Sequence, residues 1–421
     1  MKKLFRLKKL SLISFIVVVS IAAGLVITIS IYQDDSYTYT PPAINSPVPA
    51  AVYPQPISKK PSSVRKNVVD LTKKEKAAFV KAVNTLQKTI PEGSELSIYE
   101  RFVLEHVFTM NFYSSSEAKG SAKVNPAHTL PAFLPWHRQF LQEFEQALQA
   151  IDPNVTIPYW DWTDPKALSI ILQDDFLGST GEGETIEIPG AGTFKGGPIS
   201  SGLFADWTLN EKIHFDNITG ESLGSKLKRF IGLPPCSKYP IPKAKVEKLF
   251  EFDNYEIFNA LLEGALKLDK KNNWVYGWEL HAYIHSLIGG SLVDKLEPGR
   301  VPHQTQILGT MDSVPCSPYD PIFWLNHANV DRLWAEWQDR GHTGSRFYPS
   351  KGVPFGHNLR DPMWPWDGGL STPGVVDYSN LASLVPSIQL NIVVRPIDVL
   401  DFRKLGYTYD TIRLVPKPKA T

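Results

Sequence analysis

The placement of histidine is the strongest constraint on how this chain can fold. Six of its ten histidines form two groups of three that lie far apart in the sequence. The two groups are His106, His128 and His137, and His281, His285 and His327. Neutral imidazoles without thiolate or carboxylate ligands suit copper or zinc, and copper heads the affinity order of divalent first-row metals. The pattern therefore predicts a fold that gathers two distant segments around two metal ions, with open positions for a small molecule such as dioxygen.

Other metal chemistries fit the sequence less well. His281 and His285 are four residues apart in a helical pattern, so both rings lie on one face, although such a pair is often purely structural. A zinc protease needs glutamate directly after the first histidine, where this chain has Ala282. A di-iron bundle needs two Glu-x-x-His pairs, and Glu211 with His214 is a single match outside both groups. A tris-histidine zinc hydrolase would leave one group unexplained.

Composition narrows the class of protein. With 421 residues and 43% apolar residues, the chain can bury a large core as one large domain or as two or three smaller ones. The balance of 44 basic and 43 acidic residues gives no general attraction to nucleic acid, so nucleic-acid binding is not expected. Cys236 and Cys316 are too few for a disulfide framework. They could form one bridge or stay as two thiols.

The N-terminal region has the pattern of a membrane anchor. Residues 11–32 contain no charged side chain, and a helix of this length matches the roughly 30 Å apolar core of a bilayer. Basic residues in segment 1–10 precede it, and Asp34 and Asp35 follow it, so the positive-inside rule places the N-terminus in the cytoplasm and the rest outside. A cleaved signal peptide and a secreted product are the alternative.

Domain organisation follows from proline content and helical periodicity. Segment 33–69 is rich in proline and is predicted to be an extended linker. Helical periodicity begins at Asp70, so residues 70–421 are predicted to form the folded domain. We expect a mainly α fold with little β, long loops at 178–204 and 343–375, and an isolated strand near 389–396. The further helices predicted by apolar spacing are 97–113, 136–151, 245–266, 275–287 and 326–340.

Two long motifs bear a family resemblance. HTLPAFLPWHRQFLQEFEQALQAIDPNVTIPYWDW resembles the first copper-binding motif of tyrosinases and related polyphenol oxidases, and SPYDPIFWLNHANVDRLWAEWQ resembles the second. Shorter blocks extend the similarity over roughly residues 75–412, as a bacterial-type core without a C-terminal cap domain. The resemblance implies a four-helix bundle with a type-3 dicopper centre, one copper on each histidine group. It also implies oxidation of ortho-diphenols or ortho-aminophenols to quinones by dioxygen, with or without hydroxylation of monophenols.

Three positions depart from the family pattern. Pro126 stands where many members have a cysteine that crosslinks to the second histidine, so no thioether can form here. Ala282 replaces an asparagine that, in bacterial-type members, holds a water together with a glutamate; Glu263 is the candidate for that glutamate. Asn326 replaces a second histidine before His327. The lost asparagine predicts weak hydroxylation of monophenols.

The sequence also leaves alternative functions for the protein and alternative roles for several residues. A haemocyanin-like reversible oxygen carrier would use the same centre, but such proteins are large soluble assemblies with a shielding domain; an inactive scaffold would have lost ligands. The oligomeric state is left open. Asp331 is a candidate hydrogen-bond acceptor behind a ligand, or alternatively has a helix-capping role or a salt bridge with Arg332. The rings expected to pack in the core are Trp136, Phe133 and Phe323, and the histidines given no role are His214, His303, His342 and His357.

Overall fold

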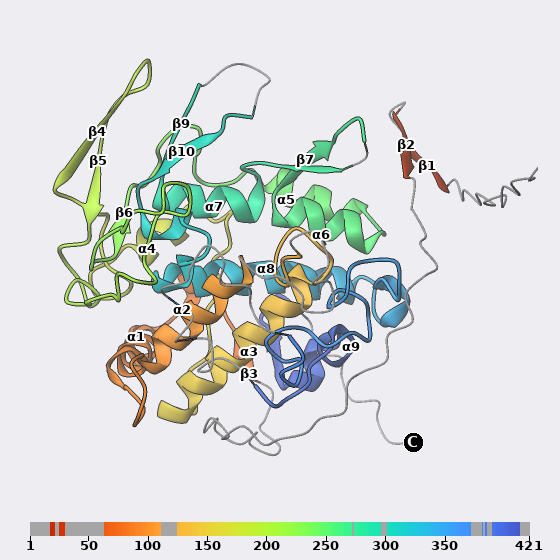
Figure 1. Cartoon of the computed structure of the whole chain (residues 1–421), viewed down its shortest axis with the longest axis horizontal. Helices are drawn as coiled ribbons and strands as arrows, with labels where there is room; N and C mark the ends of the chain where they lie inside the picture. Colours follow the sequence, from red (N-terminus) through yellow and green to blue (C-terminus); the bar gives the residue numbers. More distant parts are fainter. Residues whose placement is uncertain are drawn as a thin grey trace, which may run out of the picture.

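Helices form the centre of the molecule, with short sheets and loops around them (Figure 1). The computed structural model describes residues 17–21 and 25–29 as backbone, and residues 63–110, 124–271, 273–295, 301–371, 381, 384 and 390–412. The long helices are α1 (Lys73–Lys88), α2 (Ile98–Thr109), α3 (Phe133–Ile151), α6 (Tyr255–Glu263), α7 (Leu280–Gly289) and α8 (Ile322–Asp339). Shorter helices are α4 (Ala167–Ile171), α5 (Lys243–Glu247) and α9 (Pro396–Val399). The expected mainly α class is therefore correct.

Local sequence signals explain where several helices begin. Thr72 and Ser97 each accept a hydrogen bond from the backbone of a glutamate three residues later, and that glutamate returns a bond to the cap. These capping boxes start α1 and α2. Helices α3 and α8 have no side-chain cap and begin at Phe133 and Ile322, a few residues before the predicted starts.

Aromatic side chains join the helices that bear histidines. Phe102 of α2 makes edge contacts with Phe140 and Phe144 of α3. Phe144 stacks on Trp324 of α8, with ring centroids 3.5 Å apart. Helix α7 packs against α8, and α6 packs against α7. Because these rings are close-packed, they fix the spacing of α2, α3 and α8, which hold three of the histidines.

The β structure is confined to small pieces. Three antiparallel pieces follow residue 180: β4 (Glu184–Ile188) with β5 (Gly192–Pro198) and β6 (Lys228–Arg229), β7 (Ala265–Leu268) with β8 (Trp274–Tyr276), and β9 (Ser291–Val293) with β10 (Gln304–Ile307). The glycine-rich segment 178–204 was predicted to be a loop, but much of it is the β4–β5 hairpin. Segment 343–371 is mainly loop, as predicted.

Two helix predictions need correction. The helix expected over 245–266 is two helices, because Asn254 caps a new helix, α6, through a bond from Ile257 N, and Gly264 ends it with φ of 140°. The helix expected over 275–287 begins only at Leu280, since Trp274–Tyr276 pairs as a strand. The strand expected near 389–396 is an isolated bridge from Val393 to Asp367, with residue 389 outside the described residues.

The two ends of the folded domain meet in a parallel strand pair. Strand β3 (Ser63–Arg65) pairs with β11 (Tyr407–Tyr409). The predicted domain start at Asp70 is therefore too late, because residues assigned to the linker 33–69 form β3 and pack into the core. No proline interrupts 63–70, so this stretch can pair as a strand.

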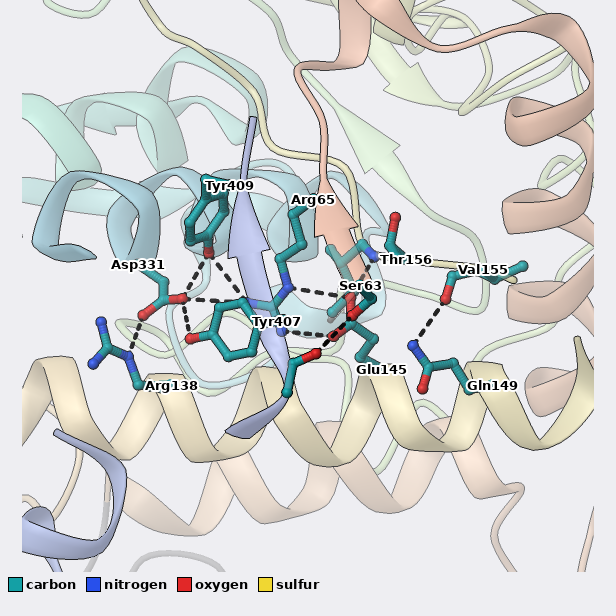
Figure 2. Close-up of polar contacts among 12 residues, drawn as sticks. Ser63, Arg65, Arg138, Glu145, Gln149, Val155, Thr156, Asp331, Tyr407 and Tyr409 are labelled. Carbon is teal, nitrogen blue, oxygen red and sulfur yellow. Dashed lines mark hydrogen bonds and ion pairs between the residues drawn. The ribbon is translucent and has the colours of Figure 1, made fainter. Parts of the chain in front are cut away.

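A buried cluster of charges lies beneath this strand pair, and we call it the ionic cluster (Figure 2). Its members are Arg65, Arg138, Glu145, Asp331, Tyr407 and Tyr409. Arg65 donates to both oxygens of Glu145 at 3.1 and 3.0 Å and to Asp331 at 3.2 Å. Arg138 donates to Asp331 at 2.6 Å. Two positive and two negative side chains thus neutralise one another inside the protein.

The N-terminal segment differs from the predicted helix over 11–32. Its described residues form two antiparallel strands, β1 (Val17–Ile21) and β2 (Leu25–Ile29). These stretches are rich in valine and isoleucine, whose β-branched side chains favour extended backbone. Within the part of the chain that the structure describes, no helix is both long and apolar enough to cross a membrane.

Candidate metal centre

The structure brings the members of each predicted histidine group together. His106 lies on α2, His128 lies in the segment before α3, and His137 lies on the first turns of α3. Their nitrogens all lie within 4.8 Å of one another, and the same holds for the second group, with His281 and His285 on α7 and His327 on α8. All six side chains are buried. We call these groups the first and second triads.

Ring nitrogens of the second triad converge on one point. His281 Nε2 lies 3.1 Å from His327 Nε2 and 3.0 Å from His285 Nε2. Two imidazole nitrogens bound to one ion at about 2.0–2.1 Å lie roughly 3 Å apart, so these separations match a shared metal ion. When one ion accepts the lone pairs of two such nitrogens, no proton is needed between the two rings.

Backbone carbonyls orient four of the rings. Nδ1 of His106 lies 2.9 Å from Pro315 O, and Nδ1 of His137 lies 2.9 Å from Phe133 O. The corresponding contacts in the second triad are His281 Nδ1 to Glu263 O at 3.0 Å and His285 Nδ1 to Met311 O at 2.7 Å. A carbonyl can only accept, so each Nδ1 carries the proton and Nε2 keeps its lone pair. Nε2 of His106 and of His137 is buried without a protein partner.

Burial also keeps the imidazoles neutral. It lowers the pKa of His106 to about 3 and that of His285 to about 4. The pKa values of the other four ring systems fall well below the usual value, because burial and neighbouring imidazoles both disfavour positive charge. Neutral rings with free lone pairs are what a metal ion requires. The donor set therefore fits two copper ions, one at each triad.

The two triads face one another across a stacked ring pair. His137 of the first triad stacks on His327 of the second, with centroids 4.3 Å apart and planes 17° apart. Phe323 lies 4.0 Å from the His327 ring, and Phe133 lies 5.1 Å from the His281 ring. Phe133, Phe323 and Trp136 are fully buried, as expected of core residues, and they also enclose the triads.

Comparison with known proteins agrees with this geometry. Residues 96–340 match the common central domain of tyrosinase. A tyrosinase from Streptomyces glaucescens is 33% identical over 312 residues, covering 72% of this chain and 93% of the relative. This chain belongs to the tyrosinase family. It is a type-3 copper enzyme that oxidises phenols, and the oxygen-carrier alternative has less support.

Further comparisons extend the tyrosinase assignment. Grixazone synthase from Streptomyces griseus is 30% identical over 330 residues, covering 72% of this chain and 93% of that protein. The solved structure of a mutant polyphenol oxidase from Thermothelomyces thermophila matches with a TM-score of 0.52 at 21% identity, covering 83% of this chain and 88% of that chain. That likeness shows that the tyrosinase fold is shared.

Glu263 connects the two triads of this tyrosinase-family chain. Its backbone carbonyl orients His281, and its Oε1 accepts a bond from Thr129 N at 2.7 Å, directly after His128. Thr129 has φ of 60°, a left-handed conformation that this bond helps to hold. Oε2 of Glu263 is buried with no hydrogen-bond partner. Burial raises the pKa of Glu263 to about 8, against the opposing effect of the Thr129 amide.

Ala282 lies close to Glu263. A Cβ atom built on Gly264 would lie 2.6 Å from Ala282 Cβ, so the methyl group rests against the residue that follows Glu263. The position that holds asparagine in bacterial-type relatives is therefore beside the predicted glutamate. In this chain it offers no polar atom.

Asp331 does not serve as an acceptor behind a ligand histidine. Its carboxylate accepts bonds from Arg65, Arg138, Tyr407 and Tyr409 in the ionic cluster. Arg332 instead donates to Glu336 at 2.6 Å. Sequence distance concealed these partners, because β3 and β11 come from the two ends of the domain.

Two histidines that were given no role are fully buried. Both ring nitrogens of His214 have partners, at Gly224 O and Thr310 Oγ1. His357 Nδ1 accepts a bond from Ala132 N at 3.2 Å, at the start of α3, and its Nε2 is buried without a partner. Burial lowers the pKa of His357 to about 3, and the Asn125 carbonyl acts in the opposite direction. His357 therefore supports the segment that contains His128 at its Ala132 end, a role that no periodic pattern in the sequence indicates.

The two cysteines are separate thiols. Cys236 and Cys316 are both buried and unpaired, which decides between the two alternatives left open by the sequence. Burial raises the pKa of the Cys316 thiol to about 11. Neither thiol is therefore available as a thiolate ligand at neutral pH.

Proposed function

We propose that each histidine triad holds one copper ion and that the enzyme oxidises ortho-diphenols or ortho-aminophenols to quinones or quinone imines. The carrying observation is the pair of triads, in each of which the nitrogens of three buried neutral imidazoles converge within 4.8 Å of one another. Bound copper supplies the capacity to pass electrons from phenol to dioxygen, so that two diphenols and one dioxygen give two quinones and two waters. The protein keeps the ligands neutral and surrounds them with aromatic rings that exclude water.

The second part of the proposal concerns the choice of phenol. A diphenol can be oxidised without a new C–O bond, whereas a monophenol must first be deprotonated and hydroxylated. Ala282 cannot orient a water beside Glu263, so general-base geometry is poor. We expect diphenol oxidation to exceed monophenol hydroxylation by on the order of a hundredfold or more.

Copper content and oxygen uptake test these two parts together. Copper-loaded protein should contain two copper ions per chain and show an intense near-ultraviolet band that depends on dioxygen. Oxygen uptake should be fast with an ortho-diphenol and slow with the matching monophenol. One tightly held zinc ion, with no oxygen-dependent band after copper loading, would overturn the proposal. Reversible oxygen binding without quinone formation would instead favour the oxygen carrier.

The third part concerns location, and its support comes from the sequence. Residues 11–32 are uncharged and follow five basic residues, Lys2, Lys3, Arg6, Lys8 and Lys9. This is the pattern of a single-pass anchor with the domain outside the cytoplasm. The proline-rich segment after it would hold the domain away from the bilayer.

Protease treatment of intact cells tests this topology. The domain should be digested from outside while the N-terminus stays protected, and deletion of residues 1–35 should give soluble, active enzyme. A mature protein that begins after residue 32 would show cleavage and secretion instead. A domain protected from external protease would contradict both arrangements.

A further inference from the structure

The β7–β8 hairpin places a tyrosine beside Glu263. The hairpin lies between the last residue of α6, Glu263, and the start of α7, which bears His281. Gly277 N donates to Gly264 O at 3.0 Å, closing the base of the hairpin next to Glu263. Tyr276 is the last residue of β8 and pairs with Ala265. Two successive residues of the hairpin are thus fixed to the two that follow Glu263.

Tyr276 and Glu263 each have one buried atom without a partner. The Tyr276 ring is partly exposed, but its hydroxyl is buried and makes no hydrogen bond within 3.5 Å. A tyrosine usually turns its hydroxyl toward water or a partner, so this orientation is unusual. Glu263 Oε2 is likewise buried and unpartnered. The first atom is a donor and the second an acceptor, so one contact would satisfy both.

The two groups are near enough to affect each other electrostatically. Burial raises the pKa of Tyr276, and the Glu263 carboxylate raises it further. In turn, the Tyr276 hydroxyl opposes the burial that raises the pKa of Glu263. A buried donor and a buried acceptor are each costly to leave unpaired, so a bond between them, direct or through one water, is strongly favoured.

We propose that Tyr276 is a positioning residue whose hydroxyl donates to Glu263 Oε2 and thereby holds the carboxyl group in place beside the triads. In bacterial-type relatives an asparagine at the position of Ala282 is the second polar group near this glutamate. Here the hairpin supplies a different polar group, which holds the carboxyl group of Glu263 but does not take the asparagine's place beside the water. The inference rests on the proposed function, because Glu263 matters only if a phenolic proton must be removed near it.

The proposal has a structural consequence that does not depend on turnover. Glu263 Oε1 accepts the Thr129 amide, and Thr129 directly follows His128. A carboxyl group held at Oε2 by Tyr276 keeps Oε1 aimed at that amide. Loss of the hydroxyl should therefore loosen the Thr129 bond and the segment around it.

The test is Tyr276→Phe in the full-length, copper-loaded protein, because this change removes only the hydroxyl. We expect hydrogen exchange to speed up about tenfold in the peptide that contains Thr129. Monophenol hydroxylation should fall about tenfold, while diphenol oxidation stays within about twofold and two copper ions remain bound. In a Glu263→Gln background the same change should have no additional effect on hydroxylation, because Tyr276 acts through Glu263.

Tyr283→Phe is the matched control. Tyr283 lies on α7, two residues after His281, but its hydroxyl donates to Lys238 O, away from Glu263. It should leave exchange at Thr129 and the ratio of the two activities unchanged. Unchanged exchange at Thr129 in Tyr276→Phe would overturn the proposal, even if the enzyme hydroxylates no monophenol. Equal loss of both activities together with copper would also overturn it, by showing a general structural role. Failure of the proposed function would appear separately, as absent copper or absent diphenol oxidation in the unaltered protein.

Discussion

Helices α3 and α8 each contribute to two buried polar regions of opposite design. His137 and Arg138 are neighbours on α3, and His327 and Asp331 are one turn apart on α8. The histidines belong to the triads, where nitrogens are neutral and several lack protein partners. Arg138 and Asp331 belong to the ionic cluster of Figure 2, where each charge faces an opposite charge.

The difference between the triads and the ionic cluster shows that the partners of a buried polar group indicate its role. In the ionic cluster, burial would raise the pKa of Asp331, but Arg138, Arg65 and two tyrosine hydroxyls lower it below the usual value. The charges of this cluster balance without a ligand, and the cluster joins β3 and β11 to α3 and α8. The first triad is incomplete, because His106 Nε2 and His137 Nε2 have no partner in the protein, and in the second triad the Nε2 atoms have only one another. Unpartnered lone pairs that converge indicate a bound metal, whereas a neutralised cluster indicates structure.

The largest expected effect distinguishes the triads from the ionic cluster through substitutions at two adjacent residues, His137 and Arg138. His137→Ala should remove copper from the first triad and reduce phenol oxidation to the level of copper-free protein, because three ligands hold that ion. The copper-free variant should unfold below copper-free unaltered protein only by the cost of the lost ring packing and of the Nδ1 bond to Phe133 O, because no buried charge is left unpaired. Arg138→Met should show the opposite pattern, with copper retained and a stability loss of about 3–5 kcal/mol, because two buried carboxylates are then left with Arg65 as their one arginine partner.

Metal analysis of the two variants measures their copper content, and calorimetry measures their stability. A His137 variant that keeps two copper ions per chain would show that this imidazole is not a ligand. An Arg138 variant as stable as the unaltered protein would show that the ionic cluster contributes nothing.

The next effect tests the ionic cluster through the N-terminal strand. Deletion of residues 1–69 removes Arg65 and leaves Glu145 with no arginine partner, so we expect a stability loss of about 3–5 kcal/mol. Deletion of residues 1–62 keeps β3 and should unfold like the full domain. Urea unfolding of both proteins measures the difference. Equal stability of the two deletions would place the true start of the domain near residue 70, as the sequence alone suggested.

This contrast explains what the sequence could and could not predict. The triads follow from residue type, from the four-residue spacing of His281 and His285, and from long motifs, all of which are local signals. The ionic cluster requires strand pairing between residues at the two ends of the domain, and no local pattern reports such pairing. Glu263 was found through a motif, but its bond to Thr129 depends on how α6 packs near the first triad.

A smaller effect is expected at His357, which the sequence led us to regard as dispensable. His357→Ala leaves the buried Ala132 amide without its acceptor, which should cost about 1–3 kcal/mol and loosen the segment that contains His128. His357→Gln can restore an acceptor and should recover much of the loss. His303→Ala is the control and should leave copper affinity unchanged. Copper affinity that is equal in all three variants would show that the triads need no support from this side.

The smallest expected effect comes from Ala282→Asn, which adds one more polar group near the triads. Ala282 lies against Gly264, so an asparagine there would extend from a Cβ close to Glu263. Ala282→Asn should therefore raise the monophenol rate about tenfold, because it adds a second group to orient the water that takes the phenolic proton. Diphenol oxidation needs no such water and should change less than twofold.

Ala282→Leu is the control of similar size, and it should not raise either rate. If Ala282→Asn raises both activities equally, its effect is on access to the copper ions, and the missing polar group at position 282 does not limit hydroxylation. If it raises hydroxylation only when Tyr276 is intact, the two polar groups act on Glu263 together, and the triad region would then share with the ionic cluster its dependence on paired groups.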